Sequence, residues 1–168
     1  MLRSFLHWLN EFCAWLDQTP LSQVIQKEAW IIPTVQIVHI LAIAMVMTSA
    51  LMIDLRLIGV VGRGQPIQRL STRFFPLIWW LILVLLATGI IMITGEPARS
   101  LQNPIFLLKM TLLIAALVIT YILQRLSRDK TFADPTKRAP IGAQALALIS
   151  VALWTGIIFS GRWIAYWV

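Results

Sequence analysis

The chain has 168 residues, of which 59% are hydrophobic, only 12% are Asp, Glu, Lys or Arg, and one is a cysteine. Soluble domains are about 45–50% apolar and about 25% charged, so the composition excludes an ordinary soluble domain and indicates a single domain in a lipid bilayer. The formal net charge of +7 does not predict a nucleic-acid partner, because the basic residues lie in short segments between apolar runs, where membrane topology explains them. The lone Cys13 excludes an intrachain disulfide and a cysteine-cluster metal site.

The N-terminal segment, residues 1–29, is too short and too charged to span a bilayer. Within it, residues 2–17 read LRSFLHWLNEFCAWLD, in which apolar side chains recur at helical spacing. This pattern predicts an amphipathic helix that lies in the membrane interface. Thr19-Pro20 then predicts the start of a second short helix that continues to Lys27-Glu28. We expect the segment to be either an anchor or lid on the rest of the chain, or a docking surface for a partner.

Residues 30–168 contain four apolar runs that are long enough to cross a membrane, each near the roughly 20 residues that about 30 Å of hydrocarbon requires. The predicted spans cover about 30–53, 75–94, 104–123 and 141–168. The predicted fold is therefore all-α: an integral membrane four-helix bundle preceded by an interfacial amphipathic helix.

The basic residues set the predicted orientation. Nine of them lie in the two loops that follow the first and third spans, whereas the N-terminal tail and the loop around Glu96 hold Arg3, Lys27 and Arg99. The positive-inside rule therefore places those two loops in the cytoplasm, and both termini and the Glu96 loop on the outer side. The nine residues are Arg56, Arg63, Arg69, Arg73, Arg125, Arg128, Lys130, Lys137 and Arg138.

Polar side chains inside the spans fall into one layer of the outer half of the membrane. His39 lies eight residues into the first span, roughly 12 Å deep at 1.5 Å per residue, with Gln36 one turn nearer the surface. Lys109 is roughly 8 Å deep in the third span and Arg162 roughly 9 Å deep in the fourth. Thr88 of the second span lies at a similar depth. Each of the four helices thus brings a polar group to this layer.

These residues have structural as well as functional interpretations. Lys109 and Arg162 have long stems that can reach the outer headgroups, and Gln36 can hydrogen-bond a neighbouring helix. His39 lies too deep to reach the headgroups, so it either bonds another helix as a neutral structural residue or serves a ligand.

Three functions use this layer. In the first, His39 ligates haem b, with Lys109 and Arg162 near the propionates, for electron transfer with a quinone or a periplasmic redox partner. There is no other intramembrane histidine, so the second axial ligand would be Met92 or Met110, or His7 if the amphipathic helix folds inward. Otherwise the haem is five-coordinate or lies between the protomers of a homo-oligomer. In the second, His39 and Met92 or Met110 handle copper(I); Met45 is a further thioether but lies nearly two turns deeper than His39. In the third, the chain is a non-catalytic membrane anchor for a periplasmic partner. The spans contain no carboxylate pair or nucleophile triad, so no catalytic residue is predicted.

Four segments carry a resemblance to an uncharacterised family of small four-span bacterial inner-membrane proteins: VQIVHILAIAM at 35–45, DLRLIG at 54–59, NPIFLLKM at 103–110 and SGRWIAY at 160–166. The resemblance runs from Trp30 onward and implies a location in the bacterial inner membrane. That family is similar, more distantly, to the copper-resistance D and cytochrome b561-like four-helix membrane proteins, although the latter pair histidines across helices and this chain does not.

The resemblance singles out His39, Asp54, Arg56, Lys109 and Arg162. Asp54 and Arg56 lie at the cytoplasmic end of the first span, far from the other three. We expect these two to fix the first loop by ion pairing and helix capping.

Overall fold

The computed structural model describes residues 2–61, 64, 66–129, 132 and 139–163. Four long helices dominate it: α3 (Ile31–Ile58), α4 (Ile67–Gly95), α6 (Pro104–Leu126) and α7 (Ile141–Trp163). Each is long and apolar enough to cross a membrane, and no strand occurs among these residues. The prediction of an all-α, multi-pass membrane bundle is confirmed. The predicted end of the fourth span, at 164–168, lies outside the described residues.

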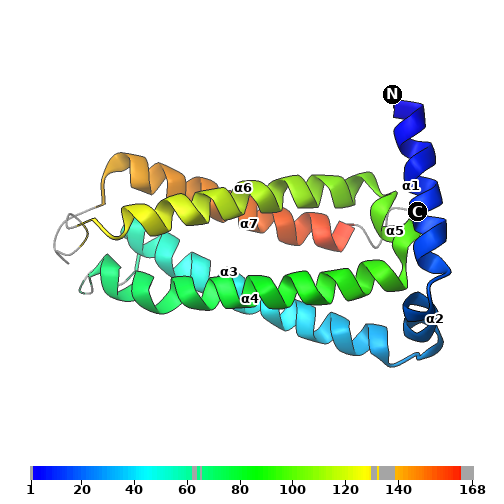
Figure 1. The fold of residues 1–168 in the computed structure, drawn as a ribbon. Helices are drawn as coiled ribbons and strands as arrows, with labels where there is room; N and C mark the ends of the chain where they lie inside the picture. Colours follow the sequence, from blue (N-terminus) through cyan, green and yellow to red (C-terminus); the bar gives the residue numbers. More distant parts are fainter. Residues whose placement is uncertain (1, 62–63, 65, 130–131, 133–138, 164–168) are drawn as a thin grey trace.

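Three shorter helices complete the described chain: α1 (Leu2–Asp17), α2 (Pro20–Lys27) and α5 (Pro97–Leu101). The helix pairs α3–α4, α6–α7 and α3–α7 pack against each other. The connections after α3 and after α6 leave from one end of the bundle, here called the loop end, while α1, α2 and α5 lie at the other, the α1 end (Figure 1). There α1 runs across the bundle rather than along it, as expected for a helix in the membrane interface.

The helices extend further than the predicted spans at the loop end. Asp54 does not end the first helix: α3 continues to Ile58 and stops at Gly59, whose φ of 86° is left-handed and whose N–H donates to the Leu55 carbonyl at 3.1 Å. Glycine adopts this conformation without a Cβ clash, so it is a common helix stop. Likewise, α4 begins at Ile67 rather than near Phe75. A charged side chain does not interrupt the backbone hydrogen bonds of a helix. Charged residues therefore mark where a span leaves the membrane better than they mark where its helix ends.

The buried apolar core lies toward the loop end of the bundle. In α3 the fully buried residues begin at Ala42, and none of residues 31–41 is buried. In α6 they begin at Ala116, and none of residues 104–115 is buried. The halves of these two helices nearer the α1 end are therefore packed less closely. The core cluster comprises Val46, Ala50, Ile53, Leu57, Ile67, Phe75, Ile78, Ala116, Leu123, Phe132, Ala139, Ala143, Ala147, Trp154 and Ile157.

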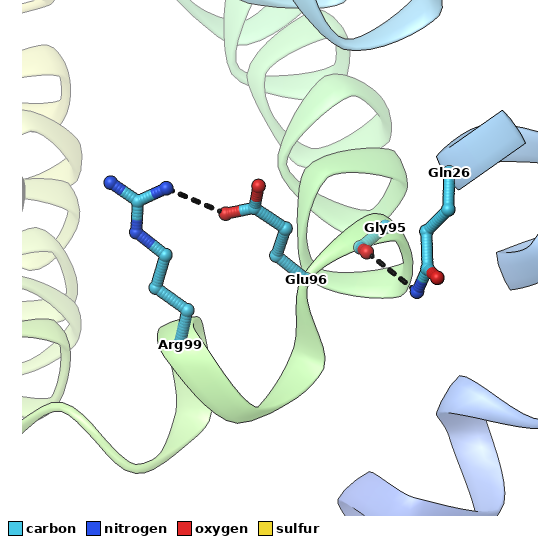
Figure 2. A network of polar contacts seen from close by, with 4 residues as sticks. All are labelled: Gln26, Gly95, Glu96 and Arg99. Atoms are coloured by element: carbon cyan, nitrogen blue, oxygen red, sulfur yellow. Dashed lines mark hydrogen bonds and ion pairs between the residues drawn. The ribbon is translucent and has the colours of Figure 1, made fainter. Parts of the chain in front are cut away.

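Side chains of α2 cap the end of α4. The Ser22 hydroxyl donates to the Thr94 carbonyl at 2.7 Å, and the Gln26 amide donates to the Gly95 carbonyl at 3.0 Å (Figure 2). The last carbonyls of a helix have no partner within it, so α2 supplies donors that α4 lacks. Ser22 is fully buried, which makes this contact a fixed part of the fold.

One face of α1 remains uncovered. Trp8, Phe12 and Trp15 are 57%, 37% and 63% exposed. The Trp8 and Phe12 rings stack with centroids 5.6 Å apart, and the Phe12 and Trp15 rings lie tilted with centroids 5.9 Å apart. Cys13, on another flank of the helix, is buried. The indole rings suit the membrane–water interface, where one side is apolar and the other is wet.

Candidate functional site

His39 of α3 is held by Thr88 of α4. The imidazole Nδ1 lies 2.7 Å from the Thr88 Oγ1, and that hydroxyl also donates to the Val84 carbonyl at 2.7 Å. A hydroxyl has one hydrogen to donate. When that hydrogen is on the Val84 carbonyl, the tautomer that bonds Thr88 is the one with its proton on Nδ1. In a neutral imidazole the lone pair then lies on Nε2, which is left available to a ligand.

Gly89 lies beside the same ring. A Cβ at this position would be 3.9 Å from the His39 Cε1, an ordinary van der Waals distance. The ring therefore faces α4 along both Thr88 and Gly89, and an alanine would be accommodated at position 89.

Lys109 approaches the His39 layer from α6, which packs against α7. Its side chain is partly buried and runs over Gly161 of α7, where a Cβ would lie 3.5 Å from Nζ and 3.7 Å from Cε. Its ammonium is near enough to His39 to act on the imidazole electrostatically. Lys109 therefore turns toward α7 and the histidine layer, and Gly161 provides the room for its stem.

The other predicted site residues are more exposed. Gln36 and Arg162 have exposed side chains, Met92 is partly exposed, and Met110 is 36% exposed. Among the described residues no three His, Cys, Asp or Glu side chains converge as a metal cluster. The structure thus joins His39 to Thr88 directly and to Lys109 electrostatically.

A family model matches residues 12–167, nearly the whole chain. The chain belongs to the family of unknown function DUF6644. Searches of curated proteins and of solved structures found no match. The DUF6644 match includes His39, Thr88 and Lys109, and it also takes in α2 and part of α1, which lie before the segments that carry the sequence resemblance.

In this DUF6644 protein Asp54 does not have the capping role expected from the sequence. It lies inside α3, four residues before the last helical residue, and is 2% exposed. Its carboxylate lies beside Ser150 of α7, and Gly59 ends the helix instead. The expectation of a cap was wrong. The sequence shows where Asp54 lies along α3, but it does not show that the side chain points toward α7.

An open pocket of about 540 Å³ lies at the α1 end of this DUF6644 chain, between α1 and α5. Polar groups line it, among them the Glu96–Arg99 ion pair at 2.9 Å, which Figure 2 shows. Burial raises the pKa of the Cys13 thiol at its wall, while a hydrogen bond with Gln102 acts the other way. Cys13 is therefore a packed thiol rather than a reactive thiolate. Sequence reasoning missed this pocket because its walls come from separate helices.

Proposed function

We propose that this protein is an electron-transfer subunit of the membrane, in which His39 binds a haem b through Nε2. The 2.7 Å contact between the His39 Nδ1 and the Thr88 hydroxyl is the observation that carries the proposal. Metal-bound histidines characteristically donate their other ring N–H to an acceptor, which fixes both the tautomer and the ring orientation. A haem supplies a one-electron carrier, and an imidazole is one of its common axial ligands.

The surrounding residues suit such a group. Lys109 brings positive charge to the layer, and Arg162 lies in the last turn of α7; such groups pair with carboxylates such as haem propionates. Residues 31–41 of α3 and 104–115 of α6 include no buried side chain, so the apolar core of these two helices does not extend to the His39 layer.

The second axial ligand does not come from His7. That residue lies on α1, is exposed, and has Nδ1 3.5 Å from the Glu11 carboxylate. Met92, one turn from Thr88 on α4, and His39 of a second copy are the two candidates that we propose.

The visible spectrum of the protein purified from haem-replete cells tests the proposal. We expect a Soret band in the wild type, its loss in His39→Ala, and its retention in the control His7→Ala. A protein that is colourless when haem is supplied, or a Soret band that survives in His39→Ala, contradicts haem binding at His39. Elemental analysis then separates the alternatives, because copper lost in His39→Ala indicates copper handling, whereas a metal-free protein leaves the membrane-anchor function.

We also propose that the chain lies in a bacterial inner membrane with α1 and both termini in the periplasm, where the haem would exchange electrons with a quinone or a redox protein. The support is the distribution of basic residues. Reporter fusions at positions 65 and 132 are expected to behave as cytoplasmic, and a fusion in the loop around Glu96 as periplasmic. The opposite pattern would reverse the orientation.

A further inference from the structure

A second polar site lies away from the histidine layer, where α3 packs against α7. Asp54 is 2% exposed and Ser150 is 1% exposed. The Ser150 side chain lies close enough to interact with the Asp54 carboxylate, and the carboxylate oxygen Oδ2 is fully enclosed with no hydrogen-bond partner among the described residues. Buried carboxylate oxygens are normally satisfied, so an orphaned one calls for a physical explanation.

Among the described residues, no counter-charge accounts for Asp54. The ion pairs among the described residues join His7 to Glu11 and Arg99 to Glu96, all at the α1 end. Two long helices pack against α3. In α7 the only ionisable side chain is Arg162, at the far end, and in α4 Arg69 and Arg73 are exposed.

The nearest buried charge along α3 is Arg56, which is 4% exposed and interacts with another group. It is two residues from Asp54, and side chains at that spacing do not face each other on a helix. An ionised carboxylate enclosed without a paired charge carries a large desolvation cost.

A second orphaned atom marks the same seam between helices. The Trp154 indole is 4% exposed, and its Nε1 is enclosed without an acceptor. Trp154 lies four residues after Ser150, so the two side chains share one face of α7. Asp54 and Trp154 each leave a buried polar atom without a partner among the described residues, and each therefore calls for a physical explanation.

We propose that Asp54, whose enclosed Oδ2 has no partner among the described residues, is a reversible proton-binding site of the bundle. Oδ2 takes a proton from hydronium, an O–H bond forms, and water is released; the carboxylate charge is removed, and Oδ2 gains a hydrogen to donate. Asp54 is four residues from the end of α3, roughly 6 Å from the loop end at 1.5 Å per residue, so the proton enters from that side. A divalent cation would need several oxygen ligands, roughly six or more for calcium, whereas Oδ2 has no polar partner among the described residues.

Infrared spectroscopy of the protein in lipid films tests this site directly. Spectra are compared across the pH range in which circular dichroism shows the helices intact. We expect a protonated-carboxyl C=O band that diminishes as pH rises, shifts in heavy water, and is absent from Asp54→Asn. Asp129→Asn, which removes an exposed carboxylate at the same end, is the matched control and should keep the band.

Ser150→Ala keeps the Asp54 carboxyl group and serves as a second test in case Asp54→Asn does not fold. We expect the Asp54 band to remain in Ser150→Ala but to move in frequency, because the protonated carboxyl group loses the neighbouring hydroxyl. Identical wild-type and Asp54→Asn spectra, or an Asp54 band that does not change with pH, would overturn the proposal. The site does not depend on haem: the band should persist in His39→Ala, so failure of haem binding and failure of proton binding are separate results.

Discussion

Replacing Gly95 with valine is expected to lower the free energy of unfolding by roughly 1–3 kcal/mol, the usual cost of overpacking a well-packed site. A Cβ at position 95 would lie 2.7 Å from the Ile32 Cδ1 and 2.9 Å from the Ile25 Cγ2. The Ile32 methyl ends a flexible chain and can rotate away. The Ile25 methyl sits on a branched Cβ in a residue that is 5% exposed, so relief requires α2 to move. That movement would strain the Ser22 and Gln26 hydrogen bonds to the end of α4.

Two measurements check this prediction. Unfolding by sodium dodecyl sulfate in mixed micelles, followed by circular dichroism, should begin at a lower mole fraction of the denaturing detergent in Gly95→Val. Cys13 is the only cysteine and is 3% exposed, so maleimide labelling should become faster if α1 and α2 loosen. Gly142→Val is the control, because a Cβ there meets nothing within 4 Å. Equal unfolding and labelling in the two variants would contradict the packing of α2 on α4.

Thr88→Val is expected to weaken haem binding about 10–100-fold, the usual effect of removing a hydrogen bond that orients a metal ligand. Valine has nearly the shape of threonine, so the ring keeps its space. The His39 ring loses the Thr88 hydroxyl, which lies 2.7 Å from Nδ1. Without this acceptor, nothing from Thr88 keeps the proton on Nδ1 and the lone pair on Nε2. Thr88→Ser keeps a hydroxyl and should retain most of the affinity.

Titration of the haem-free protein with haem, followed at the Soret band, gives the affinities of the three proteins. The comparison applies once the wild-type protein is seen to bind haem. Wild-type affinity in Thr88→Val would show that Thr88 does not orient the ligand. An equal loss in Thr88→Ser and Thr88→Val would point to packing rather than to the hydroxyl.

Local sequence signals determined the helices and several of their ends. Backbone groups in lipid must be satisfied within the segment, so four apolar runs of sufficient length dictate four helices. Thr19-Pro20 and Asn103-Pro104 start α2 and α6 as expected, with the Thr19 and Asn103 side chains accepting from the Ser22 and Ile105 amides. These features depend on neighbours in the chain, and a sequence displays such neighbours directly.

The pairing of polar groups across helices was decided only by the tertiary structure. The sequence placed His39, Thr88 and Lys109 at one depth, but not the contact of His39 with Thr88 or the path of Lys109 over Gly161. It also gave no sign that Asp54 turns inward to Ser150. The physical reason is that the lipid-facing and core-facing sides of a membrane helix are both apolar. The position of a residue along an apolar run therefore fixes how deep it lies, while the direction it faces depends on how the helices pack.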